Sequence, residues 1–583
     1  SFLQIVWLMD DIYEPLERYK NELKAAFRKN AEEAFAEIEA KATINKQENQ
    51  KLCATADSLL DKIKKHNKRL SWLLLFRVIL VVASIPLLLS FLYYESIFHP
   101  AFYTYYIVIS EVIGIFLLIC VFTTLRKRKR VLHSELVEFK QKHKNVLDLA
   151  WKQMESVNTL FSWDIPTKLI EKTVPNIKFD SYFNAARLKQ LHEEFGYDDF
   201  LNVDSSVLFA HSGEIKGNPF VIATTRNFSM GTKVYTGSKT IYWTVMERGS
   251  DGKMHSVTKS ETLHASVEKP YPYYGNNTFL LYANDAAPSL SFSRKPEGLA
   301  NEGFMINSRK RRKRRELEKF SRNLTDNYSY TMMTNQEFEV LFSTKDRDNE
   351  VEYRLLFTPI AQQQIIALMK DTEVGYGDDF EVQKRKKINV VYPTHLYDFN
   401  IDTNPARFQD YNFELVKERF MKINEEYFRA VYFAFAPLLS IPLYQQIRTR
   451  KNIYGVDLLN KSTFWEWESL VNHQGEEKFA HPSCATSNIL KTKLLRTIDN
   501  SQHDIQVTAY GFSETPRVDY VRVHGGDGRW HTIDVHWYEY NPVSRQSHVS
   551  IAEFPDSDKE VIREKDIMSH PTHNFRRKIL FRG

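Results

Sequence analysis

Apolar residues run almost without interruption in two stretches near the start of the chain. The first stretch covers residues 78–94 and the second covers residues 103–125. The turn between them, residues 95–100, contains no Lys or Arg. At about 1.5 Å of rise per helical residue, each stretch can cross a hydrocarbon core of about 30 Å. The pattern therefore predicts a two-helix transmembrane hairpin within residues 70–125.

Basic residues flank this hairpin on both sides. Lys64, Lys65, Lys68 and Arg69 precede it, and the run Arg-Lys-Arg-Lys-Arg at 126–130 follows it. Loops rich in Lys and Arg stay on the cytoplasmic side of a membrane. We therefore expect both ends of the hairpin, and the bulk of the chain, to face the cytoplasm.

Helical periodicity continues outside the hairpin. Apolar residues recur every three or four positions in residues 10–69, which we assign to an N-terminal amphipathic or coiled helical region spanning 1–69. This region is either one long helix or two helices in line. The same spacing in residues 131–159 predicts a juxtamembrane helix within 126–165. Both helices leave the same membrane face, so they can pair as an antiparallel stalk. The alternative is two amphipathic helices that pack on the globular part.

Strand-like segments dominate beyond Pro166. Residues 220–224 and 240–245 are rich in β-branched and aromatic side chains, and a glycine-containing hairpin turn follows at 249–252. We interpret 338–342 and 352–357 as further strands and 362–369 as a helix. The fold class predicted for residues 166–447 is therefore α+β, a mixed α/β cytoplasmic domain.

The last third of the chain contains one more apolar stretch. Residues 408–429 are predicted to be helical, and residues 430–443 form an apolar segment with two prolines. This segment is short for a membrane span, so we favour a buried core or interfacial position over a third crossing. Residues 448–583 form a β-rich C-terminal region, with a β-meander over 505–551 and a turn at 525–528.

Three segments of this domain resemble a known family. They read Gly-Glu-Ile-Lys-Gly-Asn-Pro-Phe at 213–220, Asn-Gln-Glu-Phe-Glu-Val-Leu-Phe at 335–342 and Val-Glu-Tyr-Arg-Leu-Leu-Phe-Thr-Pro at 351–359. The pattern resembles that of bacterial membrane proteins of domain-of-unknown-function family 3137, over roughly residues 70–400. The resemblance implies a two-helix hairpin, a cytoplasmic domain and a bacterial inner (plasma) membrane location. It implies no activity and no catalytic residues.

Composition adds little to this picture. Of 583 residues, 43% are hydrophobic and 26% are charged, which is typical of a folded chain. The net charge of +6 does not by itself indicate a nucleic-acid-binding protein. Three cysteines without a CxxC pair predict no disulfide framework, which fits a reducing compartment. Residues 1–8 are apolar but too short for a cleavable signal peptide.

Polar residues inside the predicted spans are candidate functional residues. Glu111 lies within the second span, where an ionisable group costs about 2.5–3.5 kcal/mol on insertion scales. Ser84 and Ser90 on the first span are its possible partners. One interpretation is a proton or ion pathway formed by several copies. We favour the other, a protonated glutamic acid that holds helices together.

The densest charge is a run of seven cations. It consists of Arg309, Lys310, Arg311, Arg312, Lys313, Arg314 and Arg315. Mutual repulsion favours an exposed segment, within reach of anionic lipid if it lies near the membrane. Nucleic-acid phosphate is a less favoured partner because no aromatic residues interleave with the cations. The interpretation that we favour over both is a solvated loop or a protein contact.

Several motifs fail on closer inspection. Val-Gly-Tyr-Gly-Asp at 374–378 matches the core of a potassium-channel filter but lies far from any span. Residues 231–240 have the wrong spacing for a phosphate loop. His531 and the pair Asp534 and His536 lie on opposite faces of a strand, which disfavours a metal site with His524.

No recognisable catalytic motif emerges, and we expect no metal and no cofactor. The lead hypothesis is a non-enzymatic interaction or assembly platform, held in the membrane as a homo-oligomer, with unknown protein partners. The alternatives are a membrane-tethered transporter component or enzyme of unknown reaction, and a membrane-tethered nucleic-acid binder.

Overall fold

The chain has a mixed α+β fold with a long N-terminal helix, seen in a computed structural model. The structure describes residues 13–88, 102–120, 123, 125–248, 252–323, 330–448, 458, 461–498, 502–553, 574–576 and 579–582. These residues divide between two compact units. Unit 1 holds residues 1–30, 163–404 and 424–583, and unit 2 holds residues 31–162 and 405–423.

Unit 2 is built from helices. They are α4 (Lys46–Leu88), α5 (Phe102–Cys120), α6 (Arg126–Asn158), the short 3-10 helix η6 (Pro405–Arg407), and parts of α3 (Lys24–Lys41) and α13 (Phe413–Leu439). The N-terminal helical region, predicted as one long helix or as two, is interrupted at 42–45. Helix α13 begins five residues later than predicted. Asp410 accepts a hydrogen bond from the Asn412 backbone N–H, a local turn that keeps this segment out of the helix.

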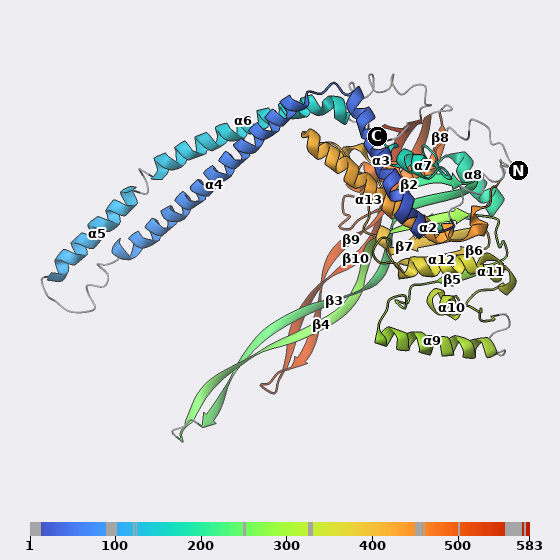
Figure 1. Cartoon of the computed structure of the whole chain (residues 1–583). Helices are drawn as coiled ribbons and strands as arrows, with labels where there is room; N and C mark the ends of the chain where they lie inside the picture. Colours follow the sequence, from blue (N-terminus) through green and yellow to red (C-terminus); the bar gives the residue numbers. More distant parts are fainter. Residues whose placement is uncertain are drawn as a thin grey trace. The chain divides into compact units, whose positions relative to one another are not determined.

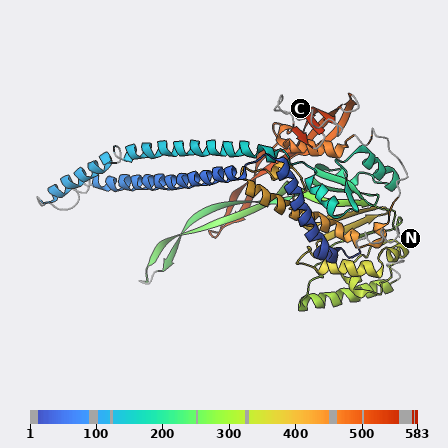
Figure 2. The same cartoon turned by 45° about the horizontal axis from the view of Figure 1, so that its top comes forward.

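Helices α4 and α6 lie side by side and antiparallel (Figures 1 and 2). His66 on α4 lies 3.3 Å from Glu135 on α6, and its ring meets that of Phe139 at 5.0 Å. Apolar positions of both helices are buried: Cys53, Ala56, Leu59, Ile63, Leu136, Ala150, Met154 and Val157. The predicted antiparallel pairing of these charged helices is therefore present.

A seven-stranded antiparallel sheet forms the centre of unit 1. Its order is β1-β2-β3-β4-β7-β6-β5. The strands are β1 (Ile177–Phe179), β2 (Ser205–Ile215), β3 (Asn218–Arg248), β4 (Met254–Ala283), β5 (Ser291–Arg294), β6 (Phe380–Arg385) and β7 (Ile388–Pro393). Residues 218–223 at the start of β3 are all buried, because helices cover both faces of the sheet there.

Helices α8 (Ala185–Phe195) and α15 (Phe464–His473) cover one face of this sheet. The Trp465 indole of α15 packs there with Val221, Phe279 and Val390. The other face packs on the last part of α13, where the Phe220 and Phe435 rings lie 4.9 Å apart. The apolar segment at 430–439 is thus a buried core helix, as expected from its length.

A five-stranded antiparallel sheet forms the β-rich tail, in the order β11-β12-β10-β9-β8. Its strands are β8 (Ile489–Thr497), β9 (Gln502–His524), β10 (Trp530–Glu553), β11 (Asn574–Arg576) and β12 (Ile579–Arg582). Helix α15 lies between the two sheets, because Trp467, Leu470 and Val471 pack on Leu490 and Val507 of this second sheet. The β-rich character and the turn at 525–528 are as predicted, but residues 505–551 form one long hairpin, β9 and β10, rather than a meander of several strands.

Two long β-hairpins extend from the sheets. β3 and β4 pair continuously to Arg248 and Met254, and β9 and β10 pair to His524 and Trp530. The hairpins run side by side (Figures 1 and 2). Their facing side chains form a small core of their own, made of Ile241, Leu263, Ala265, Ile533 and Val535.

Two segments predicted as strands are helices. Residues 338–342 belong to α10 (Gln336–Phe342), and 352–356 belong to α11 (Glu350–Leu356). The Asn335 side chain accepts a hydrogen bond from the Phe338 backbone N–H, and Asn349 does the same for Glu352. These N-caps satisfy backbone groups that a strand would have paired with a neighbour. The predicted helix at 362–369 is confirmed as part of α12 (Pro359–Lys370).

The remaining elements of unit 1 are short helices and one longer helix, α9. They are α2 (Pro15–Arg18), the π-helix η1 (Tyr19–Leu23), α7 (Ile165–Thr173), η4 (Phe200–Asn202), α9 (Phe304–Arg322), η5 (Thr394–Leu396), η7 (Pro442–Gln445) and η8 (Glu476–Lys478).

Candidate functional site

The second half of α4 presents apolar side chains that are exposed among the described residues. Within the described residues, α4 is the helix long and apolar enough to cross a membrane, and 6% of its most apolar window is buried. Trp72, Phe76, Val78, Ile79 and Val82 each expose more than half of their surface. Helix α5 likewise exposes Tyr105, Val108, Ile109, Val112, Ile115, Phe116 and Ile119.

A glycine lets α4 and α5 approach closely. Gly114 on α5 is buried, and a Cβ at that position would lie 3.0 Å from Leu88 Cγ and 3.3 Å from Leu87 Cβ. One turn earlier on α5, the Ser110 hydroxyl donates to the Leu87 carbonyl at 3.5 Å. Small residues at helix contacts are typical of membrane helix pairs.

The structure does not bring the predicted polar residues of these helices together. Ser84 is buried, but its hydroxyl donates to the Val81 carbonyl of its own helix at 2.7 Å. Glu111 is half-buried on α5, next to Ser110. Ser90 lies outside the described residues. Among the described residues, Glu111 therefore has no hydrogen-bond partner on α4.

The run of seven cations is helical rather than a loop. Arg309–Arg315 form the middle of α9, which contacts α10. Leu317 is fully buried on the inner side of α9, whereas Arg311, Arg312, Arg314 and Arg315 are exposed. Lys313 lies 2.7 Å from Glu297, and Arg314 lies 3.4 Å from Glu318.

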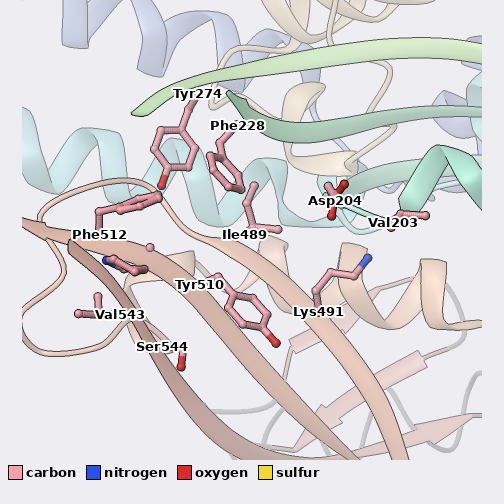
Figure 3. A pocket seen from close by; sticks show the side chains of 12 residues that line it. Val203, Asp204, Phe228, Tyr274, Ile489, Lys491, Tyr510, Phe512, Val543 and Ser544 are labelled. Atoms are coloured by element: carbon pink, nitrogen blue, oxygen red, sulfur yellow. The ribbon is translucent and has the colours of Figure 1, made fainter. Parts of the chain in front are cut away.

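A cleft of about 470 Å³ opens where the two sheets of unit 1 meet (Figure 3). Aromatic rings line it from three strands: Phe228 of β3, Tyr274 of β4, and Tyr510 and Phe512 of β9. The Phe228 ring lies 5.7 Å from that of Phe512 and 6.1 Å from that of Tyr274. Burial raises the pKa of Tyr274, so its hydroxyl stays neutral and pairs with Thr486 at 3.1 Å.

Two charged residues, Asp204 and Lys491, also line the cleft. The Lys491 ammonium turns away from it, toward the Asn202 carbonyl at 2.7 Å, the Ser205 carbonyl at 2.9 Å and the Glu468 carboxylate at 2.9 Å. Its three protons are therefore used within the fold. The cleft offers apolar and aromatic surface, and it holds no paired nucleophile and base among its lining residues.

The other motifs have structural roles. Residues 374–378 form a loop after α12, where the Asp371 carboxylate accepts hydrogen bonds from the Val374 and Gly375 backbone N–H groups. Residues 231–240 continue β3 as a strand, without the helix that a phosphate loop needs. His531 pairs with Asp527 at 3.0 Å. In the described part of the chain, no three His, Cys, Asp or Glu side chains gather as a metal site.

Sequence reasoning missed the aromatic cleft. Its lining residues come from positions 203 to 544 and meet only because the sheets meet. The spacing of two aromatic residues on β9 was the one local signal, since Tyr510 and Phe512 are two positions apart and point to the same face.

Comparison with known proteins gives no further lead: no family model, no curated protein and no solved structure matches this chain.

Proposed function

We propose that this chain is an integral membrane protein whose apolar half of α4 and helix α5 form a transmembrane hairpin. The hairpin anchors a large cytoplasmic α+β domain that serves as a non-enzymatic interaction or assembly platform. The observation that carries this proposal is the uncovered apolar surface of α4. A bacterial inner membrane location follows from the family resemblance of residues 213–220, 335–342 and 351–359.

The exposed apolar surface of α4 and α5 is solvated better by lipid than by water. Burying one large apolar side chain is worth about 1.5–3 kcal/mol, and α4 and α5 leave many exposed. A contiguous patch of this kind in water leads to aggregation, whereas lipid tails solvate it. The cations at 126–130, which begin α6, favour the cytoplasm for the end of the hairpin.

Membrane extraction tests the anchor. We expect the full chain to stay in the vesicle pellet after a carbonate wash at pH 11, and to be released by detergent. In intact cells, a protease added outside should leave unit 1 uncut, whereas permeabilised cells should lose it. Release by carbonate, or digestion of unit 1 from outside, would contradict the proposal.

Assembly is the second part of the proposal. Glu111 lies half-buried in an apolar helix, so a bilayer location favours a partner for it on another helix. Copies of the same chain provide such helices. We expect mass photometry of the protein in a mild detergent to show, after correction for bound detergent, the mass of two or more chains of 68.6 kDa each. A monomer at every concentration tested would exclude self-assembly.

The same residue favours a second candidate function, a component of a proton or ion pathway. Glu111 is the acidic residue of α5, and membrane-embedded carboxylates often carry protons. A proteoliposome flux assay separates the two candidates. Proton flux lost in Glu111→Gln supports a pathway, and absence of flux in the unmodified protein excludes it.

A further inference from the structure

Helix α9 presents two different sides. Ile306, Lys313, Leu317 and Phe320 recur at spacings of three, four and seven residues and are buried or half-buried. The opposite side carries Arg311, Arg312, Arg315, Lys319 and Arg322, all of them exposed. Figure 1 shows α9 with α10 along one of its sides. At about 1.5 Å per residue, its 19 residues extend for about 28 Å.

The cations on the outer side are not neutralised within the fold. Lys313 and Arg314 have carboxylate partners in Glu297 and Glu318. Arg311, Arg312 and Arg315 form no direct ion pair in the described part of the chain, although Arg312 is near enough to Glu316 to help lower the pKa of that carboxyl. The outer side of α9 is therefore a strip of positive charge that can accept an anionic partner.

Two large apolar side chains begin the same helix. Phe304 exposes 88% of its surface and Met305 exposes 79%, the largest exposed fractions of any Phe and Met in the described part. Phe304 lies seven residues before Arg311 and eleven before Arg315, a spacing that places all three on one side of the helix. Met305 relates to Arg312 in the same way.

Apolar residues that protrude beside a strip of cations are typical of a helix that lies in a membrane interface. The apolar side chains enter the acyl boundary, and the guanidinium groups stay among the phosphates of the headgroups. A nucleic acid would use the cations but would leave Met305 in water. The combination thus favours a lipid surface over an RNA or DNA backbone.

We propose that α9 binds the surface of a bilayer rich in anionic phospholipid, through Arg311, Arg312 and Arg315, with Phe304 and Met305 inserted. This contact is separate from the transmembrane hairpin and does not depend on it. It provides a second point at which the chain meets a membrane, and it responds to lipid charge and to ionic strength.

Vesicle flotation with the full chain tests this contact. The protein is first incorporated into nanodiscs of phosphatidylcholine, which occupies the hairpin and leaves α9 available. Vesicles of phosphatidylcholine alone, or with 30% phosphatidylserine, are then added. We expect binding to the anionic vesicles only, and loss of that binding when salt rises from 0.1 M to 0.5 M.

Two variants separate charge from insertion. Arg311→Gln/Arg312→Gln/Arg315→Gln should lower the vesicle partition coefficient by about 100-fold, because each cation near an anionic surface contributes about fivefold. Phe304→Ser/Met305→Ser should lower it by about tenfold without changing its salt dependence. Lys140→Gln/Lys142→Gln/Lys144→Gln on α6 removes the same charge from another exposed helix and should bind like the unmodified protein.

Equal binding to neutral and anionic vesicles would overturn the proposal, as would equal losses in the α9 and α6 triple variants. A short RNA that binds more tightly than the anionic vesicles, with no effect of Phe304→Ser/Met305→Ser, would also overturn it in favour of a nucleic acid.

Each variant is first compared with the unmodified protein by circular dichroism. If the triple variant is misfolded, the Phe304→Ser/Met305→Ser variant and the salt series decide the outcome. Failure of the protein to enter nanodiscs would count against the hairpin and not against α9. Binding of α9 to vesicles can then be measured by flotation of the protein in detergent-free solution.

Discussion

The Lys491 ammonium lies 2.9 Å from the Glu468 carboxylate, which is fully buried between the two sheets of unit 1. The second carboxylate oxygen of Glu468 accepts hydrogen bonds from the Val207 backbone N–H at 3.1 Å and from Asn202 at 3.2 Å. This pair links α15, β8 and β2. It forms the inner wall behind the aromatic cleft, because the stem of Lys491 lines that cleft.

Removal of Lys491 should strand a buried negative charge. We expect Lys491→Met to lower the free energy of unfolding by about 3–5 kcal/mol, and Glu468→Gln/Lys491→Met to recover part of this loss.

Burial raises the pKa of Glu468, so the folded state holds more protons than the unfolded state just above the ordinary carboxyl pKa. Stability in that range falls as pH rises, and the deficit of Lys491→Met should therefore grow from pH 5 to pH 8. Differential scanning fluorimetry at both pH values measures it. An unchanged melting temperature in Lys491→Met would contradict this account.

Gly237 sets the distance between the two long hairpins. A Cβ at this position would collide with the Asp534 carbonyl oxygen of β10, so the backbones of β3 and β10 meet closely there. Gly237→Ala should push the hairpins apart and weaken the small core around Ile241 and Ile533, at about 1–3 kcal/mol. Faster limited proteolysis within 228–273 is the expected readout. Gly275→Ala on the same hairpin is the control, because its Cβ would meet nothing nearer than 3.6 Å.

The elements that follow strict periodicity were predictable from the sequence, and the elements that depend on caps or on tertiary contacts were not. The α4 and α6 seam and the β3–β4 hairpin follow from their spacing. Phe338, Val340 and Phe342 alternate like a strand, yet all of α10 between them is buried, so alternation carried no information there. Asn349 followed by Glu352 was a usable helix-start signal. The aromatic cleft and the Lys491–Glu468 pair join segments more than 20 residues apart, and no local pattern indicates them.

Arg347 should tolerate no replacement by lysine. Its guanidinium is buried, lies 2.9 Å from Glu339 and 2.6 Å from Glu350, and stacks between the rings of Tyr330 and Tyr353 at 4.2 and 4.1 Å. A lysine keeps the charge but cannot make the planar, forked contacts. We expect Arg347→Lys to lower the free energy of unfolding by about 2–3 kcal/mol. The control is Arg354→Lys, at a half-exposed neighbour, which should change it by less than about 0.5 kcal/mol. Equal melting temperatures for the two variants would contradict the role of the stack.

Gly114 should be required for the contact of α5 with α4. A leucine there would meet Leu87 and Leu88, which already lie within 3.3 Å of an added Cβ. We expect Gly114→Leu to lower the melting temperature in detergent and to reduce cross-linking between cysteines placed at Ser110 and Leu87. The Ser110 hydroxyl lies 3.5 Å from the Leu87 backbone carbonyl oxygen, so the two helices are close at these positions. Ile113→Leu changes an exposed position on the same helix and should leave both readouts unchanged. Unchanged cross-linking in Gly114→Leu would mean that the two helices do not pack through this glycine.

Lys384 should make unit 1 more stable at alkaline pH. Its side chain is buried and donates to the Ala286 and Lys386 carbonyls, and no carboxylate of the described residues forms an ion pair with it. Burial lowers the pKa of Lys384 to about 7, so between pH 7 and pH 10.5 the unfolded chain carries a proton that the folded chain lacks. In that window the free energy of unfolding rises with pH, by at most about 1.4 kcal/mol per pH unit for this one group. Below pH 7 both the folded and the unfolded chain carry the proton, so this gain is fully lost. Lys384→Met should remove this pH-dependent gain in stability. If the variant has the higher melting temperature at pH 6, its advantage over the unmodified protein should therefore shrink from pH 6 to pH 9. Lys295→Met, at an exposed lysine, gives the reference slope. Parallel pH profiles for Lys384→Met and the unmodified protein would show that the Lys384 amine stays charged inside the fold.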